Sequence, residues 1–522
     1  MCAHWRFLES GPLGVKTETR DALRDIARCT ILAIMLTLVL GASAAGQDGA
    51  QISAVEVIPA VYHGTSLPVQ QIVSEAVNTH PANASAGGTG TVSTLIELTF
   101  DGIGSSPRQL TADTSGAVGA TQYVQSVNTE FAVYDKTTGA LVLGPVQLNS
   151  IFKGFGGPCQ TSDLGDSSTQ YDKAAGRWVL SRHTSGPPYY ECFAVSTTSD
   201  ATGSYYLYAF KMPTSDFPDY PKVGVWPDGY YVSFNLAQKN RVVAAQPCAV
   251  DRNSMLIGSP ATMICFQVTA KGNGRTLLPS DLDGATPPPS GAPNYFLGLN
   301  INSLRLYKFH VDFLNPTNST FKGPTILRVN NFAKACNGKI CVPQLDTGQL
   351  VDSVGDRPMN RVAYRNFTTY DVLVATHSVA VGNPSVSAIR WYEIRNPLGP
   401  PTIHQQGTFR PDSNFRWVGS IGMDKFGDIA VGYSVSGHKM HPAIRYTGRI
   451  PTDPLGKLEK EASIIEGSGS QQPTNHNWND VSSLSIDPVD DCTFWYTNQY
   501  YKTDSVSRWS SHIASFRFAS CR

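Results

Sequence analysis

DSSTQYDKAAGRWVLS, residues 166–181, begins with a polar Asp-containing turn and continues into a β-type run, a turn with Gly, and a second apolar β-type run. The same order of turns and strands returns four more times along the chain. The four copies are DYPKVGVWPDGYYVSFN (219–235), DRPMNRVAYRNFTTYDVLVATHS (356–378), RWVGSIGMDKFGDIAVGYSVS (416–436) and NDVSSLSIDPVDDCTFWYTNQY (479–500). A degenerate hairpin that recurs in this way is typical of an all-β repeat protein, and it predicts a β-propeller.

Strand patterns continue from residue 95 to the end of the 522-residue chain, and we expect seven blades, with six or eight as alternatives. The early strand LIELTF (95–100) and the terminal stretch HIASFRF (512–518) are predicted to pair and close the ring. Closure matters because an open sheet end exposes unpaired backbone groups. The sequence therefore predicts one propeller domain over residues 95–522.

The N-terminus has the features of an export signal. Arg24 and Arg28 precede a short apolar run, and Ala42-Ser43-Ala44 fits the small-residue cleavage pattern. We expect a signal peptide over residues 1–45, with an uncleaved anchor as the alternative. Residues 46–94 are poor in aromatics and rich in Ala, Ser, Thr and Gly, which predicts a flexible or partly ordered lead-in.

Eight of the ten cysteines follow the leader, and an even number in an exported protein indicates disulfides. Proximity in sequence favours four sequential pairs, although eight cysteines allow many connectivities. The expected pairs are Cys159–Cys192, Cys248–Cys265, Cys336–Cys341 and Cys492–Cys521. No Cys or His spacing supports a zinc site. The export signal and the even number of cysteines together predict a secreted or periplasmic, disulfide-bonded protein.

Composition and missing motifs exclude several classes of function. The 41 basic and 41 acidic residues balance, which gives no electrostatic reason to expect nucleic acid as a partner. The sequence holds no G-x-S-x-G, H-E-x-x-H, P-loop or G-x-G-x-x-G motif. We expect a monomer without a membrane span in the mature chain.

The aspartates that begin the repeats are the first candidates for a site. Asp166, Asp219, Asp356 and Asp480 would surround one mouth of the central channel if each begins an inner strand. A ring of carboxylates could bind Ca²⁺, which prefers several oxygen ligands, and we expect no other cofactor. The alternative is that each Asp bonds the backbone of its own turn.

A second set of residues could carry catalysis. His377 follows a predicted strand, Arg416 begins a repeat, and Glu393 with Asp424 could form a carboxylate pair for glycoside hydrolysis. The alternatives are a packed histidine without a partner, and a Glu393 that points outward on an alternating strand.

Several phrases together resemble a family of secreted bacterial β-propeller proteins of largely uncharacterised function. They are GAVGATQYVQSVN (116–128), GRWVLS (176–181), DYPKVGVWPDGYYVSFN (219–235), RWYEIR (390–395), QQGTFRPDSNFRWVGSIGMD (405–424) and SIDPVDDCTFWYTNQYY (485–501). The resemblance implies an exported propeller and no catalytic motif. The last phrase also resembles, weakly, the Asp-box turn of sialidases, through Ser485, Asp487, Thr493 and Trp495.

Propellers host both enzymes and binding scaffolds, so the fold does not choose between them. We expect a binding or interaction module whose ligand is a glycan or an envelope or extracellular protein. The alternative is a carbohydrate-active enzyme, a glycoside hydrolase or polysaccharide lyase, with its site at the channel mouth.

Overall fold

The computed structural model describes residues 50–73, 92–105, 111–162, 165–239, 241–269, 276–338, 340–473 and 476–521. All of them belong to one unit of the chain, which runs from Ala50 to Arg522. The predicted signal peptide, residues 1–45, lies outside the described residues. Within the described ranges, no helix has the length and apolar character that a membrane crossing requires.

Most of the described strands form seven four-stranded antiparallel groups, called blades 1 to 7 in chain order. Blades 1 and 2 are β4 (Thr114–Val118), β5 (Gln122–Val127), β6 (Glu130–Asp135) and β7 (Leu141–Gln147), then β8 (Ser168–Asp172), β9 (Arg177–His183), β10 (Tyr190–Ser196) and β11 (Tyr205–Lys211). Blades 3 and 4 are β12 (Phe217–Val225), β13 (Tyr230–Gln238), β14 (Arg241–Val250) and β15 (Thr262–Cys265), then β17 (Leu278–Asp283), β18 (Asn294–Asn300), β19 (Ser303–His310) and β20 (Thr320–Arg328).

Blades 5 and 6 follow the same plan. They are β24 (Val362–Asn366), β25 (Asp371–Val381), β26 (Val386–Arg395) and β27 (Thr402–Phe409), then β28 (Phe415–Met423), β29 (Ile429–Gly437), β30 (Met440–Arg449) and β31 (Ala462–Ile465). Blade 7 combines β32 (Ser483–Ile486), β33 (Phe494–Tyr500) and β34 (Ser510–Phe518) with the early strand β3 (Thr94–Gly104).

The remaining elements are the ten-residue strand β2 and several short strands, helices and turns. They are β1 (Gln51–Ile52), β2 (Glu56–Thr65), β16 (Val268–Thr269), β21 (Ala333–Lys334), β22 (Ile340–Val342), β23 (Val351–Asp352), the helices α2 (Val69–Val73), α3 (Gly157–Thr161) and α4 (Arg252–Met255), and the 3₁₀ turns η1 (Leu148–Phe152), η2 (Pro316–Asn318) and η3 (Ala335–Gly338). The all-β propeller that the repeated hairpin predicts is confirmed.

The repeated phrase forms the first hairpin of a blade, and blade 2 shows how. Asp172 ends β8 and holds the turn to β9, because its Oδ1 accepts a hydrogen bond from the Ala175 N–H at 3.1 Å. Successive side chains of β9 then point to opposite faces. Leu180 packs with blade 1 residues and Val179 with blade 3 residues. Burial on both faces explains why the strands are apolar almost throughout.

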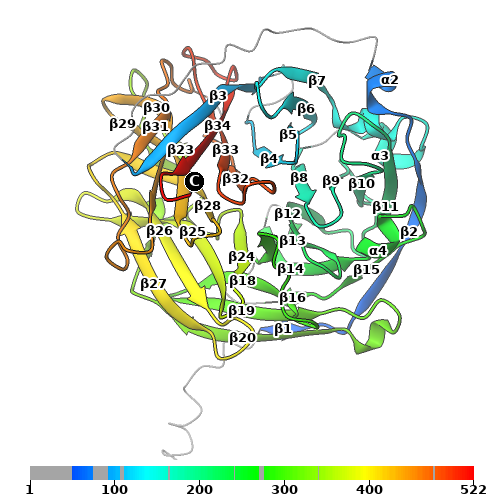
Figure 1. The fold of residues 1–522 in the computed structure, drawn as a ribbon. Coiled ribbons are helices and arrows are strands. Elements are labelled where there is room, and N and C mark those ends of the chain that lie inside the picture. The colour runs from blue at the N-terminus through cyan, green and yellow to red at the C-terminus, as the bar shows by residue number, and fades with distance from the viewer. Residues whose placement is uncertain are drawn as a thin grey trace, which may run out of the picture. The chain divides into compact units, whose positions relative to one another are not determined.

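The first strand of each blade lines the middle of the ring, as the labels β4, β8, β12, β24, β28 and β32 show in Figure 1. Each of these inner strands contacts the next, and β32 contacts β4. Ser168 Oγ and Gln170 Nε2 of β8 donate to Pro221 O and Val223 O of β12, at 3.3 and 2.8 Å. The equal offset means that β8 and β12 run parallel, as β17 and β24 also do. The inner strands therefore begin at one mouth of the channel and end at the other.

The ring is closed by strands from the two ends of the domain. β3 pairs antiparallel with β34, with Phe100 opposite Ile513, as predicted from the two sequence stretches. Asp101 of β3 accepts hydrogen bonds from His512 Nδ1 (3.0 Å) and Lys502 Nζ (2.7 Å). The last blade is thus completed by a segment that precedes the first.

Part of the predicted lead-in is ordered. β2 pairs with β11 of blade 2 through residues 60–65 and with β15 of blade 3 through residues 56–59, so that one strand covers the outer edges of two blades. β1 pairs with β16 beside it. Covered edges hold few unpaired backbone groups, which explains why this segment is held in place.

Four disulfides join the sequential cysteine pairs that the sequence predicts. They are Cys159–Cys192, Cys248–Cys265, Cys336–Cys341 and Cys492–Cys521. The last of them links the β32–β33 turn to the residues after β34, and so reinforces the closing blade.

Candidate functional site

The four residues predicted as catalytic lie in separate surroundings. His377 and Glu393 belong to neighbouring strands but to opposite faces of blade 5, since Tyr392, the neighbour of Glu393, hydrogen-bonds His377 Nε2 at 2.9 Å. Arg416 lies near the start of β28 and Asp424 just beyond its end. No hydrogen bond or ion pair described for these four joins any two of them.

The blade 5 residues His377 and Glu393 are both buried and in contact with neighbouring side chains. His377 is 1% exposed, and burial, with the nearby Arg390, lowers its pKa to about 3, which keeps the imidazole neutral. Glu393 is 2% exposed, so it does not point outward as the alternation suggests. Its carboxylate accepts hydrogen bonds from Arg395 Nε (2.7 Å) and Gln405 Nε2 (2.5 Å), which compensate its burial.

The blade 6 residues are paired as well. The Arg416 guanidinium bonds both Asp412 and Glu461, with shortest distances of 2.7 Å to each. Asp424 caps a hairpin turn by accepting the Asp428 N–H at 3.0 Å. Burial and the neighbouring Asp428 raise the pKa of Asp424 to about 7. Each of these contacts involves Arg416 or Asp424 alone, and none of them brings the two side chains together.

The repeat-start aspartates do gather, at the end of the channel where the inner strands begin, named the acidic mouth. Asp166 Oδ2 accepts a hydrogen bond from the Tyr220 N–H at 3.1 Å, and Asp113 Oδ1 accepts one from the Asp480 N–H at 2.6 Å. Each bond links the start of one blade to the start of a neighbouring blade. The side chains of Asp166 and Asp113 therefore connect neighbouring blades and do not only stabilise their own turns.

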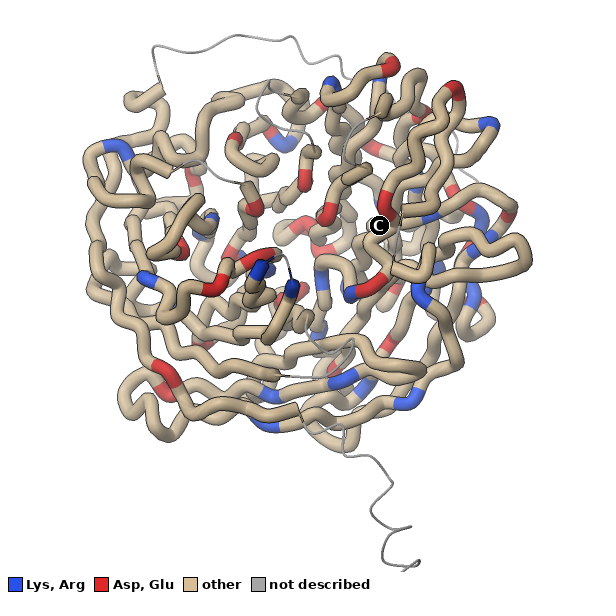
Figure 2. Tube along the Cα trace, turned by 180° about the vertical axis from the view of Figure 1, so that it is seen from behind, with Lys and Arg blue, Asp and Glu red and all other residues tan. Residues whose placement is uncertain are grey.

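A loop inserted between blades 4 and 5 brings Asp356 to the same mouth. Arg357 Nε donates to Asp356 Oδ1 at 2.8 Å, and its guanidinium carbon lies 5.0 Å from the centre of the Tyr220 ring. Lys222 Nζ lies 3.6 Å from the same ring centre. Figure 2 shows acidic and basic segments close together near the middle of the ring.

Crowding of carboxyl groups changes the protonation of the acidic mouth. Burial, followed by repulsion from Asp480 and Asp166, raises the pKa of Asp113 to about 7. Burial and the same kind of repulsion raise the pKa of Asp219 to about 6. The folded protein therefore keeps protons at a pH where free aspartates have lost them.

Among the described residues, the carboxylates of the acidic mouth do not form a group of three whose oxygens lie within 4.8 Å of one another. Ca²⁺ takes roughly six to eight oxygens at about 2.3–2.6 Å, so its ligand atoms lie close together. In the described part of the chain, three possible ligand atoms come within 4.8 Å of one another only at Asp424, Cys492 and Cys521. The two sulfurs of that group are bonded to each other in a disulfide. Ca²⁺ binding thus stays a prediction.

The raised pKa of Asp113 predicts a stability that depends on pH. The folded state binds this proton more tightly than the unfolded chain, so stability falls as pH rises from about 4 to about 7. Asp113→Asn is expected to stabilise the protein at pH 8 by roughly 1–2 kcal/mol, a value that already allows for solvent screening of the charge. At pH 4 the substitution should have little effect on stability. Urea unfolding at both pH values measures the difference.

Asp135→Asn is the matched control. The hydrogen bonds of the exposed Asp135 with Thr138 lower its pKa, so its removal should destabilise at pH 8. Equal effects of Asp113→Asn at the two pH values would contradict the proton-holding role.

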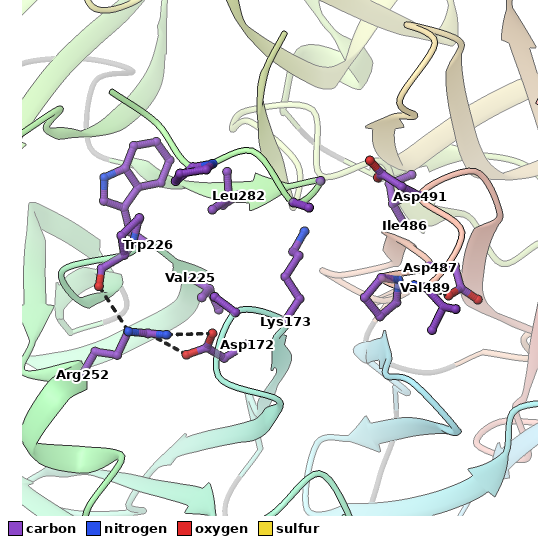
Figure 3. A pocket seen from close by; sticks show the side chains of 16 residues that line it. Asp172, Lys173, Val225, Trp226, Arg252, Leu282, Ile486, Asp487, Val489 and Asp491 are labelled. Atoms are coloured by element: carbon purple, nitrogen blue, oxygen red, sulfur yellow. Dashed lines mark hydrogen bonds and ion pairs between the residues drawn. The ribbon is translucent and has the colours of Figure 1, made fainter. Parts of the chain in front are cut away.

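The opposite end of the channel, named the cavity mouth, opens into a cavity of about 420 Å³. Its lining comes from residues at and beyond the ends of inner strands in blades 2, 3, 4 and 7. Figure 3 shows Trp226 and Leu282 on one side, Ile486 and Val489 on the other, and the Lys173 side chain pointing into the space between them. The volume lies within the range of about 300–1,000 Å³ that is usual for small-molecule sites.

Most charged groups around the cavity are already paired. Each lining carboxylate is held by one basic side chain at a short distance. The pairs are Asp172 with Arg252 (2.6 Å), Asp491 with Arg365 (2.6 Å) and Asp487 with Lys136 (2.8 Å). The cavity therefore presents apolar side chains and neutralised ion pairs.

Behind the cavity lies a buried charge cluster, made of Lys173, Asp281, Asp283 and Arg361. Arg361 places Nε 3.0 Å from Asp281 Oδ2 and Nη2 2.6 Å from Asp283 Oδ1, and its Nη1 donates to Leu484 O at 3.1 Å. Lys173 Nζ lies 3.8 Å from the same Asp283 oxygen. Burial lowers the pKa of Lys173 and raises that of Asp281. The cluster links blades 2, 4, 5 and 7 across the channel.

Sequence reasoning missed the residues of the cavity mouth, although a signal was present. Lys173 lies in the turn of the DSSTQYDKAAGRWVLS phrase and Trp226 in the equivalent turn of the next phrase. The start of each phrase lies at the acidic mouth, whereas the residues that follow each first strand line the cavity at the other end of the channel. Asp113 was missed because its phrase is less complete, but it stands directly before β4 as Asp219 stands near the start of β12.

A closed propeller with a ligand-sized cavity at one channel mouth is the class of protein that these features define. No protein-family model matches the chain, and no curated protein sequence matches it. The solved structures that are similar to it at low identity include three that each cover most of this chain. They are the polysaccharide lyase Uly1 (9% identity, 89% of this chain and 99% of that chain, TM-score 0.37), the WD40 domain of SCAP from fission yeast (10%, 89% and 98%, 0.32) and the GH43 β-1,3-galactosidase BT0265 (12%, 89% and 95%, 0.26).

Proposed function

We propose that the protein is an exported β-propeller that binds a glycan at the cavity mouth. The observation that carries the proposal is the cavity of about 420 Å³, with apolar walls and a lysine that points into it. Sites for small ligands combine such walls with a few polar groups that fix orientation. A sugar has both apolar C–H faces and hydroxyl groups, so it suits this combination.

The pairing of the carboxylates favours binding over glycoside hydrolysis. Hydrolysis needs one carboxyl that gives a proton and one that attacks or activates water. Asp172, Asp487 and Asp491 are each engaged by a basic side chain instead. The four disulfides support export, because such bonds persist in oxidising compartments.

A carbohydrate-active lyase is the second candidate, and Lys173 is the observation that favours it. Burial lowers the pKa of this lysine, which increases the fraction of neutral amine that can remove a proton. A lyase would shorten its polysaccharide, whereas a binding protein leaves it intact.

The proposal predicts that blocking the cavity abolishes binding. Val489 lines the cavity and is 68% exposed, so Val489→Trp places a bulky ring at the entrance without burying it in a core. Glycans that raise the melting temperature of the exported, oxidised protein should lose at least tenfold in affinity with this variant. Isothermal titration with product analysis by chromatography measures binding and cleavage together.

Val506→Trp is the matched control, because Val506 is also exposed (46%) and does not line the cavity. Equal binding by both variants would place the ligand elsewhere and overturn the proposed site. Shortened glycan with an unsaturated sugar at the cleaved end would replace the binding module with the lyase, and shortened glycan with saturated ends would replace it with a hydrolase.

A further inference from the structure

Lys173 is the basic group at the cavity whose hydrogen-bonding capacity remains unused. Its side chain is 17% exposed, and its nearest carboxylate oxygen, Asp283 Oδ1, lies 3.8 Å away, too far for a hydrogen bond. That oxygen is 2.6 Å from Arg361 Nη2, which already compensates it. Within the described residues, no group accepts a hydrogen bond from Lys173 Nζ. An ammonium has three N–H donors, so a ligand in the cavity can accept a hydrogen bond from Lys173 Nζ.

The charges around this lysine nevertheless cancel. Lys173 and Arg361 are balanced by Asp281 and Asp283, which lie in the same buried cluster. The remaining charged groups of the lining form three neutral pairs, Asp172 with Arg252, Asp491 with Arg365, and Asp487 with Lys136. A carboxylate or sulfate brought into the cavity would be desolvated without a net positive charge to compensate it.

From the unused donors and the balanced charge we infer that the ligand is an uncharged glycan, one of whose hydroxyl oxygens accepts a hydrogen bond from Lys173. This inference rests on the proposed function and names its ligand class. A hydroxyl oxygen offers two lone pairs and adds no net charge, so it satisfies the ammonium without unbalancing the cluster. The apolar side chains Leu282, Ile486 and Val489 would then contact the C–H surface of the sugar.

Ligand charge and salt dependence test the inference. The exported protein is titrated with neutral tetrasaccharides (of cellulose, xylan, mannan and β-1,3-glucan) and with acidic ones (tetragalacturonate, tetramannuronate and a sulfated carrageenan tetrasaccharide), each at 50 and 500 mM NaCl. We expect a neutral probe to bind best, with less than a twofold change in Kd between the two salt concentrations, because no net charge is neutralised.

Lys173→Met and Lys173→Gln test the residue. Met keeps the length and apolar stem without a donor, so we expect at least a tenfold loss of affinity for the neutral probe. Gln keeps N–H donors and should recover part of that loss, which a merely structural role of the lysine would not produce. Melting temperatures of both variants show whether the fold is intact.

Every other result contradicts either this inference or the proposed function. An acidic probe that binds best and weakens strongly with salt makes the ligand anionic and overturns this inference, while the proposed site stands if Val489→Trp still blocks it. Unchanged affinity in Lys173→Met removes the lysine from recognition, again without touching the proposed site. Failure of every probe to bind overturns the proposed function itself.

Discussion

Removal of residues 510–522 is expected to unfold the whole propeller rather than its last blade. The deletion takes away β34, which pairs with β33 on one side and with β3 on the other. Blade 7 would be left without its link to β3, and buried side chains of both partners would lose their cover, such as Phe100 of β3 opposite Ile513 and Phe494 of β33 opposite Phe516. We expect loss of the cooperative thermal transition, measured by calorimetry and near-UV circular dichroism.

The double variant Cys492→Ser/Cys521→Ser separates the strand from the disulfide. It keeps β34 and removes only the cross-link over 29 residues, which is worth about 3–4 kcal/mol in the chain-entropy model. It should therefore fold with a lower melting temperature. A truncated protein that melts cooperatively, with only the signal of one blade missing, would show that the ring does not depend on its closure.

Arg361→Met is expected to cost about 3–5 kcal/mol of stability, the range for removing one partner of a buried ion pair. The change leaves Asp281 and Asp283 in the channel without the guanidinium that lies 3.0 and 2.6 Å from them. It also leaves the Leu484 carbonyl without its donor. Urea unfolding monitored by tryptophan fluorescence measures the loss.

Two further variants test the cause. Asp281→Asn/Asp283→Asn combined with Arg361→Met removes the charges together and should recover part of the stability, because no uncompensated carboxylate remains. Arg517→Met breaks a surface ion pair with Glu97 and should cost less than about 1 kcal/mol. Equal losses from Arg361→Met and Arg517→Met would mean that the channel charges are solvated.

The fold could be predicted largely from local patterns, since hairpins and their turns are local features. The pairing of residues 95–100 with residues 512–518 was accessible because both stretches alternate and stand at the ends of the repeat array. The part played by β2 could not be foreseen. Its sequence lacks the repeated phrase, and its place depends on two outer edges, of β11 and β15, that only the assembled ring creates.

The site was harder to predict, because it depends on which residues meet across the channel. The position of Asp166 and Asp480 at the start of a repeat predicts that they share one mouth, and repulsion from Asp166 contributes to the raised pKa of Asp480. His377 looked available at the end of a strand, but packing against Phe332 and Tyr392 buries it. Lys173 and Arg361 come from different blades with no shared motif, so only the three-dimensional arrangement brings them to Asp283.

The pairing of β3 with β34 also governs when the chain can fold. Asp101 and His512 meet across 411 residues of sequence, so β3, an early strand of the domain, waits for the last strand to be synthesised. Such a topology has contacts of very high sequence separation, which slow folding and leave an unpaired edge on the nascent chain. Until residue 518 has been made, β3 has no partner in β34, and its unpaired edge is open to pairing with other chains.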